Sequence, residues 1–481
     1  MHSFTIGAAL AFAVSGVQGE CSGTADMLRY ASTTDRFYVE SSVPGQCATL
    51  TDIYNADVKD IPLYVLDDNM EIVEDGTPTG KWLLSTELYV EDGSTLVIHN
   101  EELYIRSDSE TPALNLRAHG GNLDIYRSKI YGWDYNNKQP DNDPEKETGR
   151  AYISCVSEIV VDSSQECDGR AKETMGECRM DIIESEIGYL GYQNSESYGL
   201  TWKVRGFCKD KSNLEIFDQV QVRGDLKDSD IHHLWFGLYT YGHEGGVWIN
   251  NEMHDNWKYG FDPHDDSDNL LIENNKVWNN GDHGIIASKR CNNVKILNNE
   301  VWNGQNAGIF LHRSSDGAEV AYNNVYSNGD AGLAIMESFD LNVHHNTFSN
   351  NKYGVRISVG GGTNLIKKNT FHDIWQYTMY TYKGSDLPDV PNTTGRPVEN
   401  KFIKNTLTGN HPYVIYLKEA DGTRFKKNDF SGVANEDATA SFIDSTATVY
   451  KKNLDEMITI EEDDSCFKKI KTYTDFSGSI C

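Results

Sequence analysis

The chain has 481 residues, of which 38% are hydrophobic, enough to bury a large core. Asp and Glu total 73 against 43 Lys and Arg, which gives a formal net charge of -30. A charge of this sign argues against nucleic acid or an anionic membrane surface as a partner. It is compatible with a polyanionic sugar only where local basic groups line the groove that binds it.

The N-terminal residues predict that the chain is exported. Residues 4–17 form an apolar run that ends in small residues near Gly19. This is the length of a signal-peptide core and too short to span a bilayer, although no Lys or Arg precedes it. No other stretch of the sequence is apolar enough to cross a membrane. We therefore expect a signal peptide at residues 1–19 and a secreted protein, extracellular or in the cell wall.

Nine cysteines follow, and in an exported chain they predict disulfides. Cys21 and Cys47 are expected to form a disulfide within an irregular capping segment at residues 20–60. The insertion from Cys155 to Cys178 is also expected to be cross-linked. Because nine is odd, at least one thiol is free, and Cys291 is the candidate since it lies inside a regular repeat. The spacings do not resemble a zinc site, so no metal is predicted.

Short strands with an alternating pattern begin near Ile61, as an all-β chain requires. Further on, glycines recur in steps of 24, 24, 24 and 22 residues, at Gly260, Gly284, Gly308, Gly332 and Gly354. A strand is expected after each glycine, at residues 261–264, 285–288, 309–312, 333–336 and 355–358. A period of this size indicates stacked coils, that is, a solenoid.

Asparagine marks one turn of each repeat, at Asn251, Asn275, Asn299, Asn324, Asn346, Asn369, Asn405 and Asn428. Asparagine suits a tight bend because its side chain hydrogen-bonds neighbouring backbone, and stacked amides can form a ladder. A leucine-rich repeat has a similar period, but its leucine consensus is missing here. We predict an all-β, right-handed parallel β-helix with asparagine-rich turns at residues 61–445, and a C-terminal cap or tail at residues 446–481.

Strand alternation places a candidate site on one outer face of this β-helix. Residues two and four after each glycine should point outward, which applies to Asp262 and His264. Because coils stack about 4.8 Å apart, His264, Ser288 and His312 should form one surface row. The preceding coil adds two aromatic rings to this face, and basic residues that follow the strands can pair with carboxylates of a bound chain.

The segment Tyr259-Gly260-Phe261-Asp262-Pro263-His264, on a β-helix with asparagine turns, resembles the catalytic segment of the mannuronan C5-epimerases. The stretches from His232 to Tyr241 and from His283 to Ile286 also resemble that family. The resemblance implies conversion of β-D-mannuronate to α-L-guluronate residues within alginate. It makes Tyr259 and His264 the proton-transfer pair and Asp262 the third catalytic residue.

The remaining site residues are expected to bind the substrate: His232, His233, Tyr239, Tyr241, Asp265, His283, Lys289, Arg290, His312, Arg313 and Arg356. The expected partner is a polyanionic polysaccharide such as alginate or polymannuronate, and the chain is expected to act as a monomer. No cofactor is inferred. The chain lacks the glycine-rich calcium-binding repeats of the modular secreted epimerases, so calcium dependence cannot be predicted.

The chemistry leaves two alternatives open. Removing the C5 proton of a uronate produces an enolate-like carbanion, whose carboxylate must be neutralised by cations or by a protonated acid. The same carbanion can expel the 4-O-linked sugar, which would make the protein an alginate or polyuronate lyase. A non-catalytic glycan-binding β-helix is the third class. The direction of proton transfer also stays open, since a cation such as Arg290 near Tyr259 would turn that phenol into a base.

Overall fold

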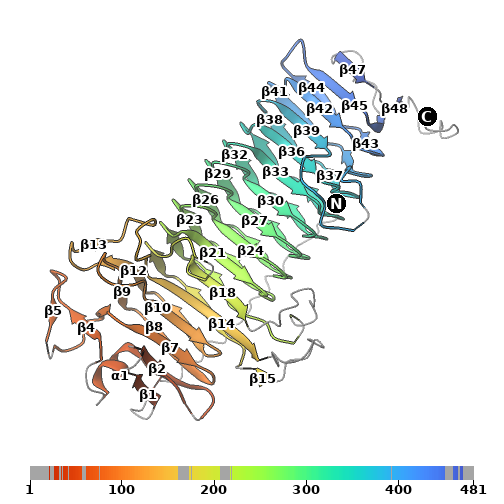
Figure 1. The fold of residues 1–481 in the computed structure, drawn as a ribbon. Helices are drawn as coiled ribbons and strands as arrows, with labels where there is room; N and C mark the ends of the chain where they lie inside the picture. Colours follow the sequence, from red (N-terminus) through yellow and green to blue (C-terminus); the bar gives the residue numbers. More distant parts are fainter. Residues whose placement is uncertain are drawn as a thin grey trace, which may run out of the picture.

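The computed structural model describes residues 21, 27–31, 34, 36–41, 43–56, 61–74, 76–160, 173–174, 176–194, 196–205, 217, 219–391, 393–449, 459–463 and 466–469. The expected signal peptide and Cys167, Cys208 and Cys481 lie outside these residues. The chain winds into a long parallel β-helix, with the first coils at one end and the last at the other (Figure 1). The predicted all-β, right-handed parallel β-helix is confirmed.

Each regular coil contributes one strand to each of three sheets, which we call A, B and C. Sheet A contains β1 (Leu28–Ala31), β2 (Arg36–Val39), β7 (Glu87–Glu91), β10 (Asn115–His119), β14 (Tyr152–Val160), β15 (Glu173–Thr174), β18 (Gly199–Arg205), β21 (Phe236–Tyr241), β24 (Phe261–His264), β27 (Ile285–Ser288), β30 (Ile309–His312), β33 (Ala331–Met336), β36 (Tyr353–Ser358), β39 (Tyr377–Tyr382), β42 (Tyr413–Lys418), β45 (Thr439–Ile443) and β47 (Thr459–Asp463).

Sheet B contains β3 (Gln46–Thr49), β8 (Ser94–His99), β11 (Asn122–Tyr126), β16 (Arg179–Ile183), β19 (Leu226–Lys227), β22 (Val247–Ile249), β25 (Leu271–Glu273), β28 (Lys295–Leu297), β31 (Glu319–Ala321), β34 (Asn342–His344), β37 (Leu365–Lys367), β40 (Lys401–Ile403), β43 (Thr423–Lys426), β46 (Thr446–Val449) and β48 (Cys466–Lys469).

Sheet C contains β4 (Leu63–Leu66), β5 (Ile72–Val73), β6 (Lys81–Leu84), β9 (Glu102–Arg106), β12 (Lys129–Asp134), β13 (Gln139–Pro140), β17 (Glu186–Gly188), β20 (Asp230–His232), β23 (Glu252–His254), β26 (Lys276–Trp278), β29 (Glu300–Trp302), β32 (Asn324–Tyr326), β35 (Thr347–Ser349), β38 (Thr370–His372), β41 (Thr406–Gly409) and β44 (Asp429–Val433).

The first coil begins earlier than the sequence predicts. In the segment expected to be irregular, β2 pairs in parallel with β7 and β3 pairs in parallel with β8. The short helix α1 (Leu50–Asn55) follows, capped by Thr49 through a capping box with Asp52. At the other end, β46 and β48 pair in parallel beyond residue 445. Parallel pairing of coils therefore extends past both expected boundaries.

The glycine-marked strands form where the sequence predicts them. β24, β27 and β30 have the predicted bounds, and β33 and β36 begin two residues earlier. The first residue after each of these glycines is fully buried in the core, as at Phe261 and Ile285. Glycine is required by close approach between coils, since a Cβ on Gly260 would lie 2.4 Å from the carbonyl oxygen of Gly284.

The asparagine ladder forms at the corner between sheets B and C, with one correction. The buried member of the fourth coil is Asn323, whereas Asn324 is exposed in β32. The backbone N–H and Nδ2 of Asn299 both donate to Oδ1 of Asn323, at 2.9 and 3.0 Å. The prediction of Asn324 is wrong because two asparagines are adjacent and only one amide turns inward.

A second asparagine ladder, which the sequence analysis missed, lines the turn from sheet C to sheet A. Its buried members are Asn256, Asn280, Asn328 and Asn351. Nδ2 of Asn256 donates to Oδ1 of Asn280 at 3.0 Å, and Nδ2 of Asn328 donates to Oδ1 of Asn351 at 3.1 Å. This ladder supports the backbone immediately before the strands of sheet A.

Both expected cross-links form, between Cys21 and Cys47 and between Cys155 and Cys178. Cys291 is free and fully buried, also as predicted. Disulfides of this kind fit an oxidising compartment. Among the residues that the structure describes, no helix has the length and apolar character needed to cross a bilayer.

Candidate active site

The candidate site lies on the outer face of sheet A, around β24. The register pairs Tyr241 with His264, His264 with Ser288, and Ser288 with His312. The predicted surface row is therefore confirmed. A second row beside it contains Tyr239, which pairs with Asp262.

Asp262 is the most unusual group of this face. Its side chain points away from the core, as the alternation predicts, yet the residue is only 1% exposed because neighbouring side chains cover it. Its Oδ1 is buried and has no hydrogen-bond partner among the described residues. Burial raises the pKa of Asp262 to about 7, and the nearby charge of His264 opposes the rise without cancelling it. At neutral pH a large fraction of this carboxyl is therefore protonated.

His264 is held by a carboxylate that is itself held by a guanidinium. Its Nδ1 contacts Oδ2 of Asp265 at a short hydrogen-bond distance, and Nη2 of Arg290 donates to the other oxygen of Asp265 at 2.7 Å. Burial alone would raise the pKa of Asp265, but the hydrogen bond and charge of His264 and the charge of Arg290 lower it overall. The ionised Asp265 accepts a hydrogen bond from Nδ1 and so orients the imidazole, which leaves Nε2 as the ring nitrogen outside this contact.

Arg290 is occupied by two carboxylates. In addition to Asp265, it donates from Nε and Nη2 to Asp266, at distances from 2.9 to 3.2 Å. The possibility that Arg290 turns Tyr259 into a base does not fit the structure. Burial raises the pKa of Tyr259 above its ordinary value, the charges of Asp262 and Asp282 raise it further, and no cation offsets the rise. Tyr259 therefore stays protonated and is a proton donor.

Tyr259 is fixed by aromatic neighbours in the turn before β24. Its ring stacks on that of His283, with centroids 5.6 Å apart and planes 12° apart, and meets Phe236 at 4.9 Å. The Nδ1 of His283 accepts the backbone N–H of Ala307 at 3.1 Å. Burial lowers the pKa of His283, so the imidazole is neutral and carries its proton on Nε2.

Four further residues of the predicted face border this group. Oγ of Ser288 and Nδ1 of His312 lie 2.8 Å apart, and burial lowers the pKa of His312 to about 4. The ring of Tyr239 lies 5.6 Å from that of His264. Burial, followed by the charges of Asp265 and Asp266, raises the pKa of Tyr241 to about 12. The phenols and imidazoles around His264 are therefore neutral at pH 7.

The predicted cations differ in how they are paired. Arg313 forms ion pairs with Glu337 at 3.1 Å and Asp389 at 2.7 Å, and Arg356 pairs with Asp330 at 2.9 Å. Lys289, by contrast, has no carboxylate within ion-pair distance in the described part of the chain. Its charge nevertheless acts on Asp265 and His312. Of these predicted cations, Lys289 is thus the one without a carboxylate partner among the described residues.

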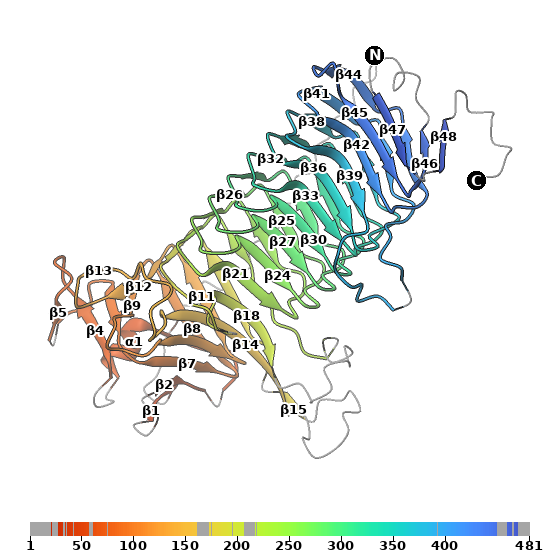
Figure 2. The same cartoon turned by 45° about the horizontal axis from the view of Figure 1, so that its top comes forward.

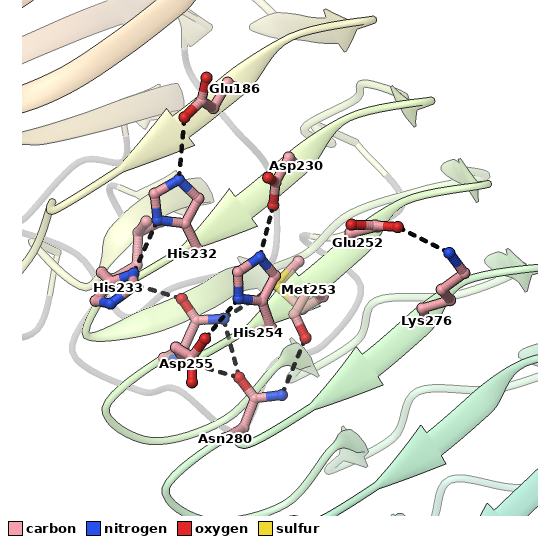
Figure 3. A network of polar contacts seen from close by, with 12 residues as sticks. Glu186, Asp230, His232, His233, Glu252, Met253, His254, Asp255, Lys276 and Asn280 are labelled. Atoms are coloured by element: carbon pink, nitrogen blue, oxygen red, sulfur yellow. Dashed lines mark hydrogen bonds and ion pairs between the residues drawn. The ribbon is translucent and has the colours of Figure 1, made fainter.

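His232 and His233 do not lie on the face that carries His264. His232 ends β20 in sheet C, where Nε2 contacts Oε1 of Glu186 at 3.4 Å and Nδ1 contacts Nδ1 of His233 at 2.9 Å (Figure 3). His254, one coil further, bridges Asp230 and Asp255 at 2.9 and 2.7 Å. These contacts give His232 and His233 protein partners on a separate sheet.

Trp278 and Trp302 pack on each other. They form a stack on sheet C that runs from His254 to Tyr326, with centroid distances of 4.2, 5.0 and 5.8 Å. The ring planes differ by only 4 to 10°, so each ring face covers the next. A sugar at this stack would contact the edges of the rings rather than their faces.

Two acidic residues of the site escaped the sequence analysis. Asp266 binds Arg290 from the preceding coil, 24 residues earlier, and the buried Glu337 binds Arg313 from the following coil, 24 residues later. The repeat length itself is the signal that could have found both. Among the described residues there is no group of three His, Cys, Asp or Glu side chains arranged to hold a metal ion.

Comparison with known proteins finds similarity to a family model and to several alginate epimerases. Residues 185–384 match the family model described as periplasmic copper-binding protein (NosD). The mannuronan C5-epimerase of Pseudomonas aeruginosa is 29% identical over 193 residues, which cover 40% of this chain and 31% of that protein. The mannuronan C5-epimerase AlgG of Azotobacter vinelandii is 28% identical over 196 residues, which cover 41% and 33%. The chain thus spans about a third of the length of these curated relatives.

The fold has a solved counterpart. The crystal structure of the periplasmic alginate epimerase AlgG superposes with a TM-score of 0.54 at 18% identity, covering 90% of this chain and 85% of that one. A double mutant of AlgG gives a TM-score of 0.61 at the same identity and covers 88% and 85%. Similarity at this identity shows the shared fold, and the curated relatives confirm the resemblance read from the sequence.

Proposed function

We propose that this chain, a relative of the mannuronan C5-epimerases, converts β-D-mannuronate to α-L-guluronate residues within a polyuronate chain. The observation that carries the proposal is Asp262, a buried carboxyl with a pKa of about 7 whose Oδ1 has no hydrogen-bond partner among the described residues. It lies on the strand that ends in His264 and follows Tyr259 by three residues. An acid, a base and a neutral carboxyl are the groups that epimerisation at C5 requires.

Asp262 stabilises the charge that develops on the substrate. Loss of the C5 proton moves an electron pair toward the uronate carboxylate, which gains negative charge. A protonated Asp262 donates its O–H to that carboxylate, and the buried site strengthens this hydrogen bond. The ammonium of Lys289 supplies a positive charge on the same face.

His264 takes the proton and Tyr259 returns one. The Nε2 lone pair of His264 breaks the C5–H bond, and the imidazolium that forms is stabilised by the Asp265 carboxylate. Tyr259, whose raised pKa keeps its hydroxyl protonated, then gives its proton to the opposite face of C5. Inversion results because removal and return use different groups, and exchange with water restores both groups.

We further propose that the chain acts outside the cytoplasm, on a polyanionic polysaccharide such as alginate. The support is the pair of disulfides and the apolar N-terminal run. Periplasmic, extracellular and cell-wall locations all fit these features.

The test is incubation of the purified protein with polymannuronate in heavy water. Proton NMR should show growing guluronate anomeric signals and deuterium at C5 of the new guluronate, because the returning proton comes from an exchanging group. Ultraviolet absorbance should stay low, since no unsaturated ends form. Dominant unsaturated ends would instead assign a lyase, and an unchanged polymer would assign a binding protein.

A further inference from the structure

Six tyrosines gather on the outer face of sheet A, several coils beyond the candidate active site. We call them the tyrosine platform: Tyr353, Tyr377, Tyr380, Tyr382, Tyr413 and Tyr416. Their rings are in mutual contact, with centroids 5.7 Å apart for Tyr353 and Tyr377, and 4.3 Å apart for Tyr377 and Tyr416. All six are half-buried, so each keeps part of its surface in solvent.

The platform continues the row that carries Asp262. Strand pairing leads from Phe310 through Ala334 and Arg356 to Tyr380 and Tyr416. The strands from β24 to β42 stay side by side along one face when the molecule is turned (Figure 2). β39 lies five coil steps from β24, roughly 24 Å at the usual strand spacing. A polymer lying along this face would reach the platform several sugar residues away from the reacting one.

The platform differs from the aromatic stack on sheet C. There the rings are nearly parallel and cover one another. In the platform only some pairs are nearly parallel, such as Tyr353 with Tyr377 at 6° and Tyr380 with Tyr382 at 12°. The planes of Tyr377 and Tyr380 meet at 54°, and those of Tyr380 and Tyr416 meet at 81°. Rings at such angles turn their faces in several directions, so packing against one another does not use all of them. Exposed ring faces bearing hydroxyls suit the C–H faces and hydroxyl groups of a sugar.

Basic residues lie beside the platform, although Arg356 is also paired with Asp330 at 2.9 Å. The ammonium of Lys352 lies 5.1 Å from the ring centroid of Tyr353, and Nη1 of Arg356 donates to the hydroxyl of Tyr382 at 3.3 Å. Lys418 ends β42 next to Tyr416 and is exposed. Local positive charge is what a chain of net charge -30 needs in order to bind a polyanion.

We infer that the tyrosine platform is a distal subsite that binds uronate residues of the same polysaccharide chain whose C5 is epimerised at β24. The inference rests on the proposed function for the identity of the polymer. Its consequence is that long substrates gain affinity from the platform, whereas oligomers too short to reach it do not.

The test compares long and short oligomannuronates on Tyr380→Ala, Tyr416→Ala and Lys418→Glu variants. For polymers, KM should rise about tenfold with kcat little changed, because the contact is the same in the ground and transition states. For a tetramer, kcat/KM should stay at the wild-type value. Tyr322→Ala is the matched control, because Tyr322 is 56% exposed and lies outside sheet A, before β32. Lys418→Glu tests the platform without removing a ring, so its result does not depend on whether loss of a tyrosine ring disturbs packing.

Equal losses on tetramer and polymer, or no loss on either, would overturn the inference. Calorimetric titration with polymannuronate separates this result from failure of the proposed function. If the wild-type protein binds the polymer without turning it over, weaker binding by the three variants still supports the platform, and unchanged binding rules it out.

Discussion

The same coils build two regions, the asparagine-lined corner between sheets B and C and the outer face of sheet A. The two regions differ in whether their buried polar groups have hydrogen-bond partners. At the corner, Asn323 donates from its side chain to Ile296 and Asn346 and accepts from Asn299, all within 3.0 Å. On sheet A, Oδ1 of Asp262 and Nε of Arg356 are buried without a partner among the described residues.

The difference follows from repetition. When the same residue recurs at the same place, each coil supplies the partner that its neighbour needs, and buried amides cost little. Around β24 the outward-facing residue type changes from one coil to the next, from Tyr239 to Asp262 and from His264 to Ser288. The adjacent coil then does not supply a matching hydrogen-bond partner. Polar side chains on this face can therefore bind a ligand, and their pKa values are shifted.

The largest expected effect is on turnover at β24. Tyr259→Phe and His264→Ala should each lower kcat by about 100-fold to 10,000-fold, the usual scale for a positioned acid or base. Both side chains lie outside the core, so circular dichroism and the melting temperature should change little. His372→Ala, an exposed histidine of sheet C, is the control and should leave kcat unchanged. If the first two variants keep near-native rates while folded, the reacting residues lie elsewhere on the β-helix.

The second effect is on stability at the asparagine corner. Asn323→Ala removes the partner of buried backbone and side-chain groups on two coils, which should cost about 3 to 5 kcal/mol. Asn324→Ala, one residue along, removes an exposed amide and should change stability by about 0.5 kcal/mol or less. Denaturant midpoints of the two variants measure the contrast. Similar midpoints would mean that the ladder does not stabilise the coil.

The third effect separates stability from function at Asp262. Its folded pKa of about 7 lies above the ordinary value of 3.8, so ionisation of the buried carboxyl adds no destabilisation below about pH 3.8, destabilises the protein increasingly as the pH rises from there to about 7, and adds a constant cost above that. Asp262→Asn removes this dependence. Between pH 5 and pH 8 the wild type should lose about 2 to 3 kcal/mol relative to the variant.

Melting temperatures of both proteins at the two pH values give the measurement. Turnover of the wild type should also fall above pH 7, where the carboxyl loses the proton that it donates, and the remaining turnover of Asp262→Asn should not. A pH-independent difference in melting temperature would show that Asp262 does not titrate in this range.

The sequence predicts what repeats and misses what depends on one particular contact. The strands at Phe261–His264 and Ile285–Ser288 were predicted because glycine and apolar residues recur with a fixed period. The two other strands of each coil were missed, since three residues, as in Glu252–His254, are too few for a pattern. That omission is why the sequence could not place His232 on a face of the β-helix.

In the candidate site, too, some features could be predicted from the sequence and others could not. The row from Tyr241 through His264 to His312 followed from the strand register alone. The burial of Asp262 could not be predicted, because it depends on side chains from neighbouring coils. The ion pair of Arg313 with Asp389 could not be predicted either, because Asp389 lies in the long loop between β39 and β40. Such contacts are set by packing and leave no local signal in the sequence.

The smallest expected effect tests whether this loop contact contributes to stability. Nη1 of Arg313 pairs with Glu337, whose side chain is 1% exposed, and with Asp389, whose side chain is 62% exposed. Water screens the exposed pair, so Asp389→Ala should cost less than about 1 kcal/mol. Glu337→Ala should cost clearly more, because it also leaves the backbone N–H of Val390, now bound at 2.7 Å, without its acceptor. Thermal melts of both variants measure this difference.

A large loss of stability in Asp389→Ala would mean that the loop between β39 and β40, which carries Asp389, holds Arg313 in place. The KM for polymer should then change as well, because Arg313 follows the strand that ends in His312.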